Sequence, residues 1–276
     1  MRLPARGEAV RSLGLTVPPA RMPMFRGSRP RKRWRYVGYY AAELMLCVGD
    51  ARIGPVAQRW WAVATPDGTL RERTTVGRGG VTVAPGRVSV LAGDVKIDLV
   101  LRESGGVETA SPTAAGSYVW TRKQAGVPVR GVVEIGGERH EIDGIAFVDE
   151  SAGYHDRHTA WKWSAGNGVA RDGRTVAWNL VSGVHDAPAD SERSVWVEGG
   201  PSEVGPVEFA PDLSRVSFAE GGALEFREWA ARAEDMNLLV MRSHYRQPFG
   251  TFSGTLPGGI ELAEGYGVME EHDVLW

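Results

Sequence analysis

Residues 95–103 read VKIDLVLRE, and apolar and polar side chains alternate along this stretch. Val95, Ile97, Leu99 and Leu101 share one face, and the charged side chains fall mostly on the other. A two-residue period is typical of a strand that buries one face and exposes the other. The stretch therefore predicts a half-buried antiparallel strand.

The same strand and turn rhythm continues on both sides of this segment. Residues 127–144, VPVRGVVEIGGERHEIDG, predict a hairpin that turns at Gly136 and Gly137. The chain holds 36 glycines, spread between short apolar runs, which indicates many tight turns. We count about fifteen or more candidate strands, too many for one eight-stranded barrel. The prediction is an all-β protein with little helix, built from two packed antiparallel β-barrels or half-barrels.

Four stretches allow narrower predictions. Residues 1–30 contain five prolines and are expected to form an extended lead-in. Residues 103–117 are rich in Gly, Ser and Thr and predict a loop. Only 38–47 and 225–236 have a composition that would also suit a helix.

Strand count and chain length suggest three parts. Residues 1–33 form a basic extended arm, 34–148 a first β-barrel-like domain, and 149–276 a second.

Charge is distributed unevenly along the chain. Residues 1–37 carry a net charge of +9, whereas the remainder carries −11. Such an arm would bind nucleic acid or an anionic membrane, or would lie across the acidic body of its own chain or of a second subunit. We favour an arm that lies across the acidic body of its own chain or of a second subunit, because nothing else resembles a nucleic-acid-binding module. Contact with a second subunit would make the protein a homodimer.

Composition excludes several classes of protein. Cys47 is the only cysteine, so neither an intrachain disulfide nor a cysteine-built metal site can form. No apolar run approaches the roughly 20 residues of a transmembrane helix. The first residues lack the apolar core of a secretion signal, so we expect a cytoplasmic protein.

Residues 149–168, DESAGYHDRHTAWKWSAGNG, combine aromatic bulk with charge. This mixture suits a pocket wall, where apolar surface shapes a ligand and a few polar groups act on it. If the stretch were a continuous strand, Asp156 and His158 would share one face, and Trp161 and Trp163 the other.

Two further polar clusters accompany this stretch. His185 and Asp186 follow an apolar strand, and the chain closes with the cluster 270–273, EEHD. Together the histidines and carboxylates would suffice for a metal ion, but their spacing matches no metal signature, and we predict no metal and no cofactor. An acid–base pair in an apolar pocket is the alternative, and a structural His–Asp hydrogen bond is the plainer reading.

Several blocks of the sequence carry a family resemblance. Residues 153–161, GYHDRHTAW, resemble a motif of the bacterial carotenoid 1,2-hydratases and the related AttH-like proteins. Residues 158–168, 177–186 and 265–276 are more similar to an uncharacterised bacterial domain family, which we interpret as a distant relative of the hydratases. The resemblance covers about residues 30–276 and implies a pair of lipocalin-like (calycin) barrels or half-barrels.

The resemblance also implies roles for individual residues. In hydratases of this type an acidic residue protonates an isoprenoid double bond, which would make Asp156 the proton donor and His155 its neighbour. Tyr154 and Trp161 would line the pocket. The sequence departs from the hydratase pattern at 157–159, which leaves the hydration chemistry open while the pocket is still expected.

Two functions follow as hypotheses. The first is a binding protein for an apolar, lipid- or isoprenoid-like small molecule in a β-barrel pocket. The second is an enzyme of the hydratase, cyclase or isomerase type that acts on an isoprenoid or polyketide-like substrate. The candidate catalytic residues are Asp156, His155, His158, Glu270 and His272. The candidate ligand contacts are Tyr154, Arg157, Trp161, Trp163, Asn167, Asn179, His185 and Glu271.

Overall fold

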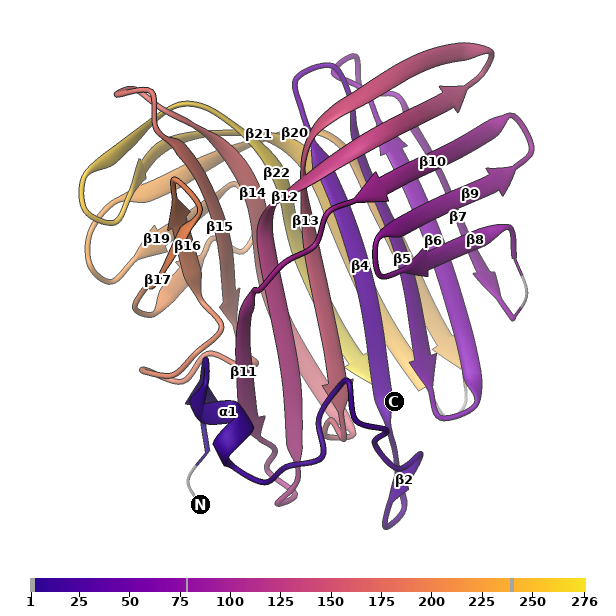
Figure 1. Ribbon diagram of the computed structural model, residues 1–276, viewed down its shortest axis with the longest axis vertical. Coiled ribbons are helices and arrows are strands. Elements are labelled where there is room, and N and C mark those ends of the chain that lie inside the picture. The colour runs from indigo at the N-terminus through magenta and orange to yellow at the C-terminus, as the bar shows by residue number, and fades with distance from the viewer. Residues whose placement is uncertain (1–2, 78, 239–240) are drawn as a thin grey trace.

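Two antiparallel sheets form most of the protein in the computed structural model, which describes residues 3–77, 79–238 and 241–276 (Figure 1). The first sheet has eleven strands in the order β7-β6-β5-β4-β13-β12-β10-β9-β8, with β11 beside β12 and β1 beside β11. Its strands are β1 (Ala5–Arg6), β4 (Lys32–Tyr40), β5 (Met45–Ile53), β6 (Val56–Ala64), β7 (Leu70–Val76), β8 (Val81–Ala84), β9 (Arg87–Ala92), β10 (Val95–Leu101), β11 (Val107–Pro112), β12 (Tyr118–Ile135) and β13 (Glu138–Gly153).

The second sheet has nine strands in the order β17-β16-β15-β14-β22-β21-β20-β19-β18. Its strands are β14 (His158–Ala170), β15 (Thr175–Ser182), β16 (Ser194–Val197), β17 (Gly200–Glu203), β18 (Val207–Phe209), β19 (Arg215–Phe218), β20 (Ala223–Leu238), β21 (Met241–Leu256) and β22 (Ile260–Leu275). The remaining elements are the helix α1 (Ala9–Ser12) and a small hairpin of β2 (Phe25–Arg26) and β3 (Arg29–Pro30).

Each sheet curls until one edge strand approaches the third strand from its opposite edge, since β8 contacts β5 and β18 contacts β15. Figure 1 shows the two curled sheets side by side, with the yellow strands of the second sheet passing behind β4 to β6 of the first. The predicted all-β class and the two half-barrels are confirmed. The chain passes from the first sheet to the second between Gly153 and His158.

Local sequence explains the elements that alternation predicted. In β10 buried and more exposed residues alternate as expected, with Ile97 and Leu99 fully buried. The β12–β13 hairpin turns at Gly136 and Gly137, which have φ angles of 59° and 89°. Positive φ at both central residues is what a tight hairpin turn requires, and glycine adopts it without steric cost.

Four local expectations are corrected by the structure. Residues 225–236 lie in β20, where pairing with β19 and β21 overrides the helical composition. The stretch 38–47 is split between β4 and β5, which pair directly across the turn. The expected loop 103–117 contains β11, and the expected extended lead-in contains α1 and three short strands.

The interior of each curl is filled with apolar side chains. Ile97 and Leu99 belong to the cluster that fills the first curl, and Trp178 and Phe252 belong to the cluster that fills the second. Close packing of this kind leaves little room for a ligand.

A third apolar cluster lies between the sheets and includes Tyr36, Phe147, Trp163 and Phe249. It joins the two half-barrels into one body.

The basic arm lies on its own chain. β1 extends the first sheet beside β11, and Val10, Val17 and Met22 pack in a cluster with Trp120 and Tyr154. Among the described residues no helix is long and apolar enough to cross a membrane.

Candidate functional site

A cavity with a volume of about 170 Å³ is lined by residues of both sheets. Five of the ten tryptophans line it: Trp34, Trp60, Trp161, Trp163 and Trp276. The pocket that we expected inside a barrel is thus replaced by a cavity between the half-barrels, because side chains fill both curls.

Glu270 forms the polar centre of one end of this cavity. Its carboxylate accepts hydrogen bonds from Trp161 Nε1 at 2.8 Å, Gln247 Nε2 at 2.7 Å and the Tyr245 hydroxyl at 3.2 Å. Burial raises the pKa of Glu270 above its ordinary value, although the hydrogen bond from Trp161 opposes the shift and the charge of Asp149 adds to it.

His272 lies two residues further along β22 and faces the same cavity. Its Nε2 is 2.8 Å from the Ser243 hydroxyl, and its ring centroid is 4.5 Å from that of Trp161. Burial lowers the pKa of His272 to about 4, although the charge of Asp273 opposes this shift. The imidazole is therefore neutral at neutral pH.

A buried charge cluster forms another part of the wall. Lys123 Nζ lies 2.7 Å from Asp149 Oδ1 and 3.2 Å from Glu192 Oε1. Burial raises the pKa of Asp149 while Lys123 opposes the shift, whereas the pKa of Glu192 falls because Lys123 and His185 outweigh the effect of its burial. Two buried carboxylates therefore share one ammonium group.

His155 and His185 lie at the end of the cavity that Trp34 also lines. Their ring centroids are 6.3 Å apart, and the ring of His155 is 5.0 Å from that of Trp34. All four ring nitrogens are buried, and none has a hydrogen-bond partner among the described residues. Burial lowers the pKa of both imidazoles, so both are neutral at neutral pH.

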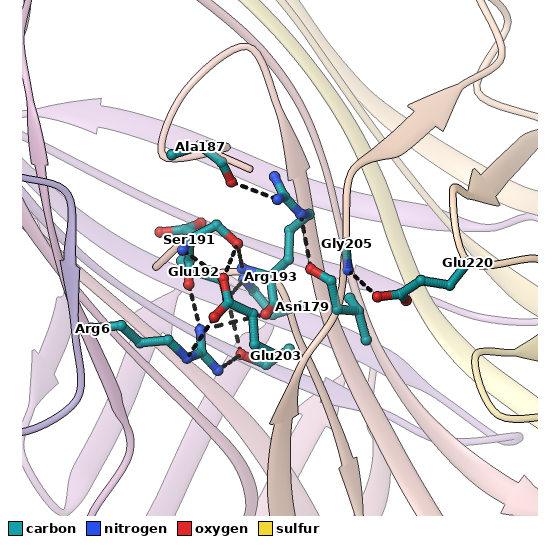
Figure 2. A network of polar contacts seen from close by, with 11 residues as sticks. Arg6, Asn179, Ala187, Ser191, Glu192, Arg193, Glu203, Gly205 and Glu220 are labelled. Atoms are coloured by element: carbon teal, nitrogen blue, oxygen red, sulfur yellow. Dashed lines mark hydrogen bonds and ion pairs between the residues drawn. The ribbon is translucent and has the colours of Figure 1, made fainter. Parts of the chain in front are cut away.

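The loop that carries His185 and Glu192 is fixed by the polar network in Figure 2. Arg6 reaches from the N-terminal arm to the carbonyl of Ser191, and its Nη2 lies 2.9 Å from the hydroxyl of Ser194. Asn179 donates to the carbonyl of Glu192 at 2.9 Å.

Further along the same network, Arg193 donates to the carbonyls of Ala187 at 2.7 Å and Val204 at 3.2 Å (Figure 2). The arm and the second half-barrel therefore both hold this part of the wall.

Lys32 is a buried cation at the cavity wall. Its side chain is 3% exposed, and Nζ lies 4.0 Å from the ring centroid of Trp276. Burial and the charge of Arg29 lower the pKa of Lys32 to about 7, although Asp156 opposes the shift.

Six of the residues expected from the sequence line the cavity. They are His155, Trp161, Trp163, His185, Glu270 and His272. Asn179 lies behind the wall, where its Oδ1 accepts a hydrogen bond from Trp163 Nε1 at 2.8 Å.

Asp156 lies outside the lining. Its carboxylate accepts hydrogen bonds from Arg29 at 2.9 Å and from the backbone amides of Ala114 at 2.8 Å and Ala115 at 3.3 Å. Burial alone would raise the pKa of Asp156, but these hydrogen bonds outweigh it and hold the pKa below its ordinary value. The group therefore serves as an anchor between the arm and a turn.

The other expected site residues also point elsewhere. Tyr154 packs with the arm and donates to the carbonyl of Pro23 at 2.9 Å, and Asn167 donates to the carbonyl of Tyr40. On the outer surface are Arg157, His158, which pairs with Asp273, and Glu271, which lies 3.8 Å from Lys162.

Sequence reasoning missed a group of charged and aromatic wall residues. They are Lys32, Trp34, Lys123, Asp149 as part of a charge cluster, Glu192, Arg232 and Tyr245. The sequence carried no clear signal for Lys123, because it lies in the polar run 121–124 of β12 and only packing shows that it is buried. Within the described residues no three His, Cys, Asp or Glu side chains are grouped so that they could hold a metal ion.

Comparisons with known proteins support the architecture. The sequence model of a family described as "Domain of unknown function (DUF2804)" matches residues 81–276. No curated protein sequence matches the chain.

Two crystal structures share the fold. A Nitrosomonas europaea protein assigned as an AttH is 15% identical, with a TM-score of 0.60 over 94% of this chain and 99% of that one. Kievitone hydratase from Nectria haematococca is 9% identical, with a TM-score of 0.53 over 89% of this chain and 88% of that one. At these identities the similarity establishes the fold, in line with the AttH-like resemblance of the sequence.

Proposed function

The chain belongs to the DUF2804 family, and we propose that it binds an apolar small molecule in the cavity between its two sheets. The observation that carries this proposal is the set of five tryptophans around one cavity, with Glu270, His272 and His155 facing into it. Aromatic walls with a few convergent polar groups are characteristic of sites for small molecules. Large aromatic side chains also contribute most of the apolar contact area of such sites.

The proposal is tested with the neutral fluorophore N-phenyl-1-naphthylamine. Its binding is followed by energy transfer from the tryptophans, and we expect saturable binding with one site per chain. In Trp161→Leu the affinity should fall by about tenfold, because a wall of the cavity is lost. Trp229→Leu is the matched control, since Trp229 is also partly buried but does not line the cavity.

Two results would contradict binding in this cavity. One is the absence of saturable binding to the unmodified protein. The other is an equal loss of affinity in Trp161→Leu and Trp229→Leu, which would place the fluorophore elsewhere.

A second candidate function is acid catalysis on the bound molecule. The pKa of Glu270 is raised, and its carboxyl group faces an apolar cavity, as a group that protonates an alkene must. Glu270 would transfer its proton to one alkene carbon, and water would add to the resulting cation and return a proton to the carboxylate. We assign this role to Glu270 and not to Asp156, whose carboxylate is held by Arg29 and two backbone amides.

This second function is tested with geraniol and related isoprenoid alcohols in deuterium oxide. Protonation by the enzyme would place a carbon-bound deuterium in the product, which mass spectrometry detects. We expect Glu270→Gln to abolish the label while N-phenyl-1-naphthylamine still binds, and Asp156→Asn to retain it. If the label is lost in Asp156→Asn and kept in Glu270→Gln, the proton donor is Asp156 and not Glu270.

A further inference from the structure

The two histidines at the Trp34 end of the cavity are buried, and their ring nitrogens lack hydrogen bonds within the described part of the chain. His155 is 6% exposed, and both of its ring nitrogens are buried without a partner there, as are those of His185. Leaving a buried polar group unsatisfied destabilises the folded state. A pair of such groups in one cavity wall therefore calls for an explanation.

The backbone at His185 carries a second signal. Its φ angle is 51°, in the left-handed region that a residue with a Cβ atom rarely adopts. Such backbone strain persists only where the surrounding structure holds it, and it is found preferentially at functional sites. The network around Arg6 and Arg193 holds the loop in this conformation (Figure 2). His185 is thus kept at the cavity wall against its own backbone preference.

The protonation state of the pair determines what it can recognise. Both imidazoles are neutral because burial lowers their pKa values, so each offers one N–H donor and one acceptor nitrogen. A hydroxyl group both donates and accepts, so it can satisfy an acceptor on one ring and a donor on the other. A carboxylate only accepts, and it would add a third negative group near Asp149 and Glu192, which already share one ammonium group.

We propose that His155 and His185 together bind a hydroxyl group at one end of the apolar ligand. This inference rests on the proposed binding function and specifies the ligand further: an aromatic or isoprenoid body lies against the tryptophans, and its hydroxyl lies between the two imidazoles. The order of affinities among closely matched probes then depends on the head group and not on the apolar body.

Three probes of nearly equal shape test the proposal: 2-naphthol, 2-methylnaphthalene and 2-naphthoate. Dissociation constants are measured by ligand-detected NMR at neutral pH. For the unmodified protein we expect 2-naphthol to bind at least about tenfold more tightly than 2-methylnaphthalene. The imidazole signals of His155 and His185 should shift on addition of 2-naphthol and not on addition of 2-methylnaphthalene.

Two variants assign the preference to the histidine. His155→Phe keeps a planar ring without nitrogens, so the two probes should bind with similar affinity. His155→Gln retains a donor and an acceptor and should keep part of the preference, which a merely structural role of the ring would not explain. If His155→Phe fails to fold, two measurements on the unmodified protein still test the hydroxyl site: the ratio of its affinities for 2-naphthol and 2-methylnaphthalene, and the shifts of its imidazole signals.

The outcomes separate this inference from the proposed function. Equal affinity of the unmodified protein for 2-naphthol and 2-methylnaphthalene overturns the hydroxyl site and leaves an apolar binding protein. Tightest binding of 2-naphthoate also overturns it, in favour of an anion site. If neither these probes nor N-phenyl-1-naphthylamine binds, the proposed function fails as well.

Discussion

The two ends of the cavity differ in how their polar side chains are satisfied. At one end Glu270 accepts three hydrogen bonds, and His272 is bonded to Ser243. At the other end His155 and His185 have no partner on any ring nitrogen among the described residues. The first end is preorganised by the protein itself, whereas at the second end the protein leaves the ring nitrogens available to the hydroxyl group that we propose. Similar substitutions should therefore have opposite effects on stability at the two ends.

The largest effect is expected at the satisfied end. In Glu270→Leu the donors of Trp161, Tyr245 and Gln247 lose their common acceptor, and each orphaned donor costs about 1–3 kcal/mol. We expect the free energy of unfolding in urea to fall by about 4 kcal/mol. The control is Glu271→Leu, whose weak ion pair with Lys162 contributes less than about 1 kcal/mol. Similar losses in the two variants would show that the three donors find other partners.

The second prediction concerns the pH dependence of the same end. Burial lowers the pKa of His272 from 6.5 to about 4, so the unfolded chain binds a proton more readily than the folded one. The stability that His272 contributes is complete above pH 6.5 and is lost as the pH falls toward about 4. The loss amounts to about 3 kcal/mol at most.

Denaturation curves at several pH values between 7 and about 4 test this sign. The variant His272→Gln should lose less stability over that window than the unmodified protein does. Asp273 and His244 also act on His272, so the difference between the two proteins, and not either curve alone, is the relevant quantity. If the stabilities of the two proteins fall in parallel with pH, His272 is not the source of the pH dependence.

Much of the fold was predictable because strand alternation is a local property. The face of β10 that carries Ile97 and Leu99 follows from a two-residue period, and the β12–β13 hairpin follows from Gly136 and Gly137. The pairing of sheets is not local. Lys123 lies in β12 of the first sheet and Glu192 in the loop before β16 of the second, and only the packing of the two half-barrels brings them together.

The candidate site shows where alternation stops being informative. Between Gly153 and His158 the chain leaves strand geometry to cross from one sheet to the other. Strand alternation extended across this gap predicted that Asp156 and His158 share one face. In the structure Asp156 bonds to Arg29 and His158 to Asp273, so the two contribute to separate surfaces. The face of Trp161 could be assigned correctly because β14 is continuous beyond the gap.

The smallest and most specific prediction concerns the unsatisfied end. Replacing His155 by Phe removes two buried nitrogens that have no partner among the residues that the structure describes, so the free energy of unfolding should rise by about 1 kcal/mol. Without ligand, His155→Phe should thus be more stable than the unmodified protein. Ligand binding should reverse this order of stabilities, because a ligand that binds only the folded state stabilises it more when its affinity is higher. Saturating 2-naphthol should therefore raise the melting temperature of the unmodified protein more than that of His155→Phe. If the variant is less stable than the unmodified protein without ligand, His155 has a partner within the chain, and the contrast between the two ends does not hold.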